Sequence, residues 1–128
     1  MTDDFPDDVR QFIADHINSA AELELLLLLK GDPGKQWTAD EVGKSLYTSG
    51  EMCATQLGDL SSRGLLIVTS DGQPRYQYRP SSEELHRLIV RLDDLYQQRR
   101  VSVITMIYSK PVDRVRTFAD AFRLRKEK

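Results

Sequence analysis

The chain has 128 residues, of which 40% are hydrophobic and 30% charged. This length and composition are typical of one soluble globular domain with short extensions, and a core of this size folds without disulfides or structural metals. The longest apolar runs, at residues 25–29 and 103–107, are far shorter than the roughly 20 residues that a membrane-spanning helix needs, so no membrane partner is expected. The single cysteine, Cys53, excludes an internal disulfide and fits a cytoplasmic location.

The net charge of −2 is unevenly distributed along the chain. Residues 1–64 carry 5 basic and 12 acidic side chains, whereas residues 65–128 carry 13 basic and 8 acidic ones. Because phosphate binding requires positive charge, any contact with nucleic acid is expected to involve the second half. The isoelectric point of about 5.7 argues against a protein that coats nucleic acid without selectivity.

The first thirty residues predict two helices. Pro6 suits the first turn of a helix, and apolar residues recur at helical spacing from there to Ile17. Ser19, with Glu22 three residues later, predicts a capping box that opens a second helix. Five consecutive leucines predict that this helix is buried around most of its circumference, and the sequence GDPG at residues 31–34 ends it.

A short capped helix is predicted next, from residue 39 to about residue 46. Thr38 and Glu41 have the spacing of a capping box, in which each side chain accepts a hydrogen bond from the other residue's backbone N–H. Trp37, just before the cap, is placed to pack on Val42 as a hydrophobic staple.

The same pattern repeats at once. Thr48 and Glu51 predict a further capping box, with Tyr47 and Met52 as its staple, for a helix that ends at Gly64. The residues expected on its inward face are Cys53, Leu57 and Leu60. Two short helices that meet across one or two residues are typical of a helix-turn-helix motif.

A β-hairpin is predicted directly after this motif. Residues 65–69 are rich in branched side chains, residues 70–73 are typical of a turn, and residues 75–79 alternate as a returning strand. Pro74 favours an edge position for the start of that strand. A hairpin at this position is typical of a wing.

The remaining chain predicts a long helix and a basic tail. Ser81 and Glu84 predict another capping box, and the apolar stripe then continues up to the sequence SKP at residues 109–111. Such a helix would have nearly 30 residues and measure about 40 Å, so its far end is expected to pack on another chain. Residues 113–125 predict a further amphipathic helix, with an apolar face formed by Val115, Phe118, Ala119 and Phe122.

The tail at residues 110–128 has 7 basic and 3 acidic side chains and allows three hypotheses. It is a packing helix with a solvated basic face, or it contacts nucleic acid, or it docks on an acidic partner or a membrane.

The order of these elements resembles the winged helix domain of bacterial transcription regulators. The sequence QLGDLSSRGLLIV at residues 56–68 is similar to the passage from recognition helix to wing in the MarR-like superfamily. The resemblance covers residues 19–80 and implies a mainly α fold with a small β-hairpin wing. Residues 1–18 would then be an N-terminal helical extension, and residues 81–128 would be C-terminal dimerisation helices ending in the basic tail.

The resemblance also implies a function, that of a homodimeric transcription regulator that binds double-stranded DNA. Residues 48–62 would lie in the major groove, and residues 81–128 would pair two chains. Outward side chains of that helix would include Glu51, interpreted here as a cap residue with a solvated charge. The DNA-contacting residues implied in this way are Lys44, Thr48, Ser49, Thr55, Arg63, Arg75 and Arg79.

The recognition helix departs from the family pattern, because residues 48–62 contain no lysine or arginine. Since phosphate neutralisation usually dominates affinity for DNA, the positive charge would have to come from flanking residues or the tail. The alternative hypothesis is a winged-helix module that binds a protein partner and not DNA.

No set of catalytic or metal-ligating residues is evident. His16 and His86 are isolated on different predicted helices and are interpreted as core or boundary residues. Cys53 is interpreted as a small buried hydrophobic residue, with a redox switch as the competing hypothesis. The sequence therefore predicts no enzyme activity, no cofactor and no metal.

Overall fold

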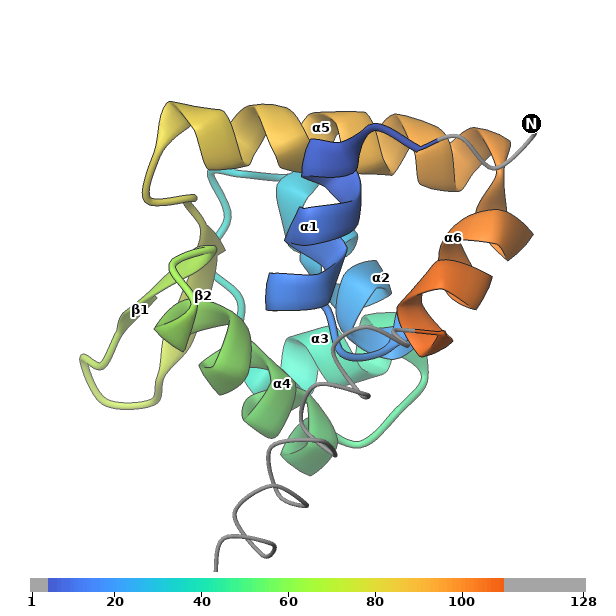
Figure 1. Cartoon of the computed structure of the whole chain (residues 1–128). Coiled ribbons are helices and arrows are strands. Elements are labelled where there is room, and N and C mark those ends of the chain that lie inside the picture. Colours follow the sequence, from blue (N-terminus) through green and yellow to red (C-terminus); the bar gives the residue numbers. More distant parts are fainter. Residues whose placement is uncertain (1–4, 110–128) are drawn as a thin grey trace, which may run out of the picture.

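The computed structural model describes residues 5–109, which form six helices and a two-stranded hairpin at one edge of the domain (Figure 1). This confirms the predicted mainly α fold with a small β-hairpin. In chain order the elements are α1 (Asp7–His16), α2 (Ala20–Lys30), α3 (Ala39–Leu46), α4 (Gly50–Ser62), β1 (Leu66–Thr69), β2 (Arg75–Tyr78), α5 (Glu83–Gln98) and α6 (Arg100–Tyr108). The predicted helix at residues 113–125 and the tail at residues 110–128 lie outside the described residues.

One hydrophobic core joins all of these helices. In Figure 1, α5 runs along the top, α1 and α2 lie below it, and α3, α4 and the hairpin form the lower part. The leucine run of α2 is largely buried as predicted, although Leu27 and Leu28 keep partial exposure. Because α1 contacts both α5 and α6, the first helix belongs to the same core as the rest.

Side-chain caps open four of the six helices described, and three of these caps involve a residue other than the one predicted. Thr38 and Glu41 form the full capping box, with hydrogen bonds of 3.0 and 3.2 Å. Ser19 accepts from the Glu22 backbone N–H at 3.0 Å, but the Glu22 carboxylate accepts from the N–H of Asn18 and not from that of Ser19. Asn18 therefore takes the place of Ser19 as the backbone donor to Glu22 at the start of α2.

The turn between α3 and α4 corrects the prediction for Thr48. The N-cap of α4 is Ser49, whose hydroxyl accepts from the Met52 N–H at 3.1 Å. Tyr47 ends α3 in the left-handed conformation (φ 58°), which directs its side chain into solvent. The predicted staple is therefore wrong, because Tyr47 is 95% exposed and Met52 is 59% exposed.

Gly43 makes the tight joint sterically feasible. A Cβ atom at this buried position would lie 2.8 Å from the Thr48 carbonyl oxygen, closer than van der Waals contact allows. The two helices of the motif consequently pack with their backbones almost touching at this point.

The hairpin lies where the sequence predicted its two strands and turn. β1 and β2 pair antiparallel, with Leu66 opposite Tyr78, and Gly64 leads into them with a φ of 84°. Trp37 adds a bridge beside β2, because its backbone exchanges two 2.7 Å hydrogen bonds with Tyr76. The hairpin is thereby tied to the segment that precedes α3.

The predicted long C-terminal helix is wrong. The N-cap of α5 is Ser82 and not the predicted Ser81, because the Ser82 hydroxyl accepts from the Leu85 N–H at 3.1 Å. The helix is interrupted at Arg99, whose backbone is not helical (φ −137°, ψ 57°). α6 then turns away from α5 (Figure 1), and its Val103 and Ile107 are buried in the chain's own core. The predicted packing of this end on another chain is thus partly replaced by packing within the domain. No helix among residues 5–109 is long and apolar enough to span a membrane.

Candidate nucleic-acid interface

Helix α4 presents one face to the core and the other to solvent. Cys53, Leu57 and Leu60 are fully buried, as the spacing predicted. The exposed face carries small and polar side chains and no lysine or arginine: Glu51, Met52, Ala54, Thr55, Gly58, Asp59 and Ser62. Small outward residues leave room for a close approach by a macromolecular surface.

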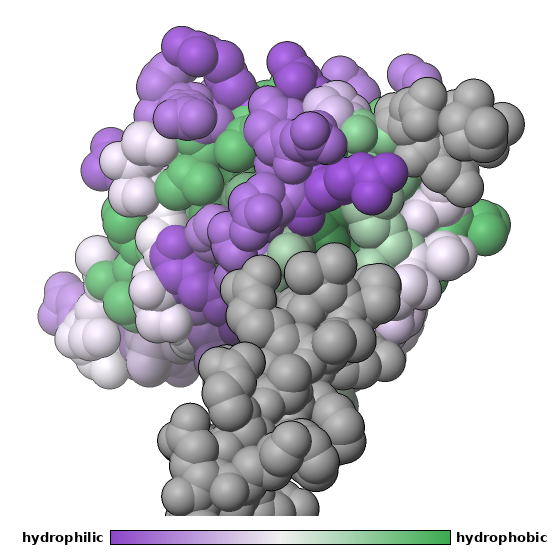
Figure 2. Space-filling view, viewed as in Figure 1, coloured by the Kyte–Doolittle hydropathy of each residue, from purple (hydrophilic) through white to green (hydrophobic). Residues whose placement is uncertain are grey.

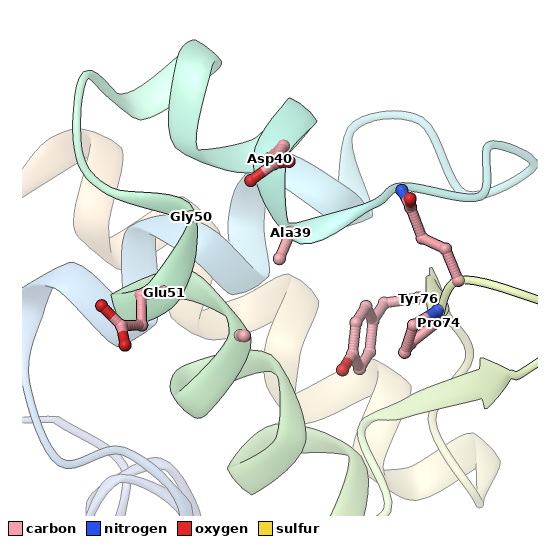
Figure 3. Close-up of a pocket in the computed structure, with 8 residues that line it drawn as sticks. Ala39, Asp40, Gly50, Glu51, Pro74 and Tyr76 are labelled. Atoms are coloured by element: carbon pink, nitrogen blue, oxygen red, sulfur yellow. The ribbon is translucent and has the colours of Figure 1, made fainter.

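A groove of about 290 Å³ lies between the start of α3, the start of α4 and the base of the hairpin. Figure 3 shows Tyr76 and Pro74 together on the hairpin side, and Asp40 and Glu51 on the opposite side, where α3 and α4 meet. Its lining residues are Ala39, Asp40, Gly50, Glu51, Ala54, Gln73, Pro74 and Tyr76. The groove is mostly apolar, with carboxylates at one end.

The groove end formed by α3 and α4 is acidic. Neither Asp40 nor Glu51 has an ion-pair partner within residues 5–109. The adjacent Glu41 has a pKa below its usual range, chiefly because the Thr38 backbone N–H donates to its carboxylate, with the charges of Lys35 and Arg75 contributing. These carboxylates oppose a phosphate backbone at this end of the groove.

Most of the sequence-predicted contact residues are exposed but not gathered in the groove. Lys44 lies in the last turn of α3, Thr48 and Ser49 form the turn, and Thr55 points outward from α4. Arg75 and Arg79 are exposed at the two ends of β2. Since Pro74 and Tyr76 line the groove, Arg75 is the cation nearest to it in the sequence.

Arg63 has a different environment from the other predicted contacts. Its guanidinium donates to the Glu22 carboxylate at 3.0 Å and to the His16 carbonyl at 2.7 Å. The Glu22 side chain is 3% exposed and that of Arg63 is 24% exposed. This ion pair joins the end of α4 to the end of α1 and the start of α2, and no pattern in the sequence predicted it.

The isolated histidines and the cysteine have structural environments. The His16 ring stacks on Phe12, and Nδ1 of His86 lies 2.9 Å from the Tyr78 hydroxyl. Burial, with a contribution from the Asp93 charge, raises the pKa of Tyr78 to about 12. Burial also raises the pKa of the Cys53 thiol, which disfavours the reactive thiolate.

No cluster of three or more His, Cys, Asp or Glu side chains within residues 5–109 has the arrangement of a metal site.

Two short helices joined by a tight turn, an outward second helix and a following hairpin define the winged helix-turn-helix fold.

The comparison with solved structures agrees with this fold. This chain is similar to the homodimeric winged helix-turn-helix DNA-binding domain (fragment 1–100) of Mb0332 from Mycobacterium bovis, a possible ArsR-family transcriptional regulator. The two share 18% sequence identity with a TM-score of 0.53, over 72% of this chain and 82% of the other. The PcaV regulator of Streptomyces coelicolor has 20% identity and a TM-score of 0.48, covering 85% of this chain and 74% of its own. A MarR family protein from Bacillus stearothermophilus has 15% identity and a TM-score of 0.49, covering 94% and 82%. No protein-family model and no curated protein sequence matches this chain.

Proposed function

We propose that this protein is a transcription regulator that binds double-stranded DNA as a homodimer. The observation that carries the proposal is the exposed face of α4, held beside a hairpin whose second strand begins at Arg75 and is followed by Arg79. In this arrangement α4 enters the major groove, and β1 and β2 act as the wing. Residues 81–128 pair the two chains.

The roles of the polar residues follow from their positions. Thr55, exposed on α4, hydrogen-bonds base edges, and Ser49 and Thr48 approach the backbone from the turn. Lys44, Arg75 and Arg79 supply the phosphate contacts. Arg63 is left out of the proposed interface, because its guanidinium is held by Glu22 and His16.

The number of proposed phosphate contacts sets the expected salt dependence of binding. Three phosphate contacts per chain give six per dimer, so log K against log salt concentration should have a slope of about −5. The measurement is fluorescence anisotropy with DNA selected from a random pool, between 50 and 300 mM salt. A folded protein that selects no DNA sequence even at low salt contradicts the proposal.

Arg75→Ala tests the wing. We expect it to weaken binding to all DNA sequences alike and to reduce the salt slope by about 2 in a dimer. Arg10→Ala is the matched control, because Arg10 is exposed on α1, outside α4, the hairpin and the residues proposed to pair the chains. Equal affinities of the two variants would remove Arg75 from the interface.

Pairing of two chains is tested separately. Sedimentation of the full chain should give a mass of about twice 14.7 kDa at micromolar concentration. A monomer that still binds one half-site would keep the DNA proposal and reject the dimer.

The acidic groove favours a second candidate function, binding of a basic protein segment. Asp40 and Glu51 border an apolar surface that suits the stem and charge of a lysine or arginine, and they repel phosphate. Asp40→Asn with Glu51→Gln separates the two functions. The pair should strengthen DNA binding if α4 contacts DNA, and should abolish capture of a stoichiometric protein partner if the groove binds one.

A further inference from the structure

Helix α6 has apolar side chains on its outer face as well as on its inner one, with the exposed Thr105 among them. Its inner residues Val103 and Ile107 are buried in the core, yet Val101 is 77% exposed and Tyr108 is 50% exposed. Ile104, between them on the same face, is only partly buried. Exposed apolar side chains that share one helix face are commonly covered by another segment or another chain. In Figure 2, pale and green residues lie over α6 on the right, whereas α5 along the top is mainly purple.

The sequence that follows α6 has the complementary pattern. Nineteen residues, 110–128, continue from its end, and Pro111 stops the helix and favours a turn. Their apolar positions at helical spacing are Val115, Phe118, Ala119 and Phe122. This stripe spans about 10 Å at 1.5 Å per residue, the same length as the exposed stripe from Val101 to Tyr108.

We propose that residues 113–125 of the same chain fold back as a helix on the outer face of α6 and cover Val101, Ile104 and Tyr108. The short connection at residues 109–112 is of the length that joins antiparallel helices in an αα-hairpin. Contiguity also favours the chain's own segment over a second copy, because a short link gives a millimolar effective concentration.

Charge supports the same docking site. The segment at residues 110–128 has a net charge of +4, and its arginines flank the apolar stripe on both sides. α1, which contacts α6, carries exposed carboxylates at Asp7 and Asp15, whereas Asp8 pairs with Arg91 of α5. Attraction between the basic segment and the acidic α1 favours docking on the part of the domain that contains α6. This inference does not depend on DNA binding, and it leaves α5 and the outer side of the segment for pairing of two chains.

Limited trypsin digestion of the full chain tests the proposal, because trypsin cleaves after Arg114, Arg116, Arg123 and Arg125. Val101→Asp places a charge in the seam at a position that is exposed without the segment, so the domain should stay folded. We expect it to raise the cleavage rate at these arginines at least about tenfold. Val68→Asp is the matched control, because Val68 is 45% exposed on the hairpin. Phe118→Asp should reproduce the effect from the other side of the seam.

The outcomes separate the occupants of this face. Cleavage that Val101→Asp and Phe118→Asp accelerate, at a rate independent of protein concentration, supports docking within one chain. Protection that disappears on dilution means that a second copy covers α6, and it overturns the proposal. Equal cleavage rates in all variants mean that the segment does not dock on α6. The emission of the only tryptophan, Trp37, reports that each variant is folded.

Discussion

Replacing Arg63 with methionine isolates the contribution of the buried ion pair to stability. The change removes the guanidinium but keeps most of the apolar stem. In the folded protein it leaves the Glu22 carboxylate, 3% exposed, with the Asn18 N–H as its one remaining donor among residues 5–109. It also leaves the His16 carbonyl without its 2.7 Å partner. Removing one partner of a buried pair costs about 3–5 kcal/mol, because the remaining charge is uncompensated.

The lower end of that range applies here, since the Arg63 side chain is 24% exposed and water partly solvates the site. We therefore expect a loss of about 3 kcal/mol in the free energy of unfolding. For a urea m-value of about 2 kcal/mol/M, the unfolding midpoint should fall by about 1.5 M.

The matched control is Arg91→Met. Arg91 pairs with Asp8 at 3.4 Å, but both side chains are more than half exposed, so the expected loss is below about 0.5 kcal/mol. Urea unfolding followed by Trp37 fluorescence measures both variants, with equal m-values as the condition for comparison. Equal midpoints for the two variants would refute the structural role of Arg63 and return it to the candidate DNA contacts.

Three further predictions concern packing and reactivity. Ile107→Ala should lower the free energy of unfolding by about 2–4 kcal/mol, because Ile107 is 1% exposed. Val101→Ala should lower it by less than about 0.5 kcal/mol, because Val101 is 77% exposed. Equal losses in thermal or urea unfolding would place α6 away from the core. Gly43→Ala should destabilise the protein by about 1–3 kcal/mol, since the new Cβ would lie 2.8 Å from the turn backbone. Gly58→Ala should stabilise it by about 0.5–1 kcal/mol, because there is open space around this helical glycine. A change of the same sign for both variants would contradict the close packing of α3 and α4. Cys53 should react with a thiol reagent at pH 8 at least about a hundredfold more slowly in the native protein than in urea, because burial raises the pKa of its thiol. The contribution of Cys53 to stability is complete below its unfolded pKa and declines as pH rises through that value. Labelling that is faster in the native protein would reopen the redox hypothesis.

The local elements were determined largely by the sequence itself. The Thr38 capping box, the buried face of α4 and the left-handed Gly64 depend on residues within a few positions of one another, so spacing alone predicts them. The hairpin register follows from the same short-range turn chemistry. Corrections of one residue, such as Ser49 in place of Thr48, arise because neighbouring hydroxyls compete for the same cap.

Tertiary structure decided the features that depend on contacts between distant residues. The apolar pattern from α5 into α6 is continuous in sequence, but burial of Val103 and Ile107 in a core that α1 also enters bends the chain at Arg99. The partner of Arg63 is 41 residues away in the chain, and local spacing gives no sign of it. Periodicity reports which face of a helix is apolar, whereas only the assembled fold decides which surface covers that face and which charges remain for a ligand.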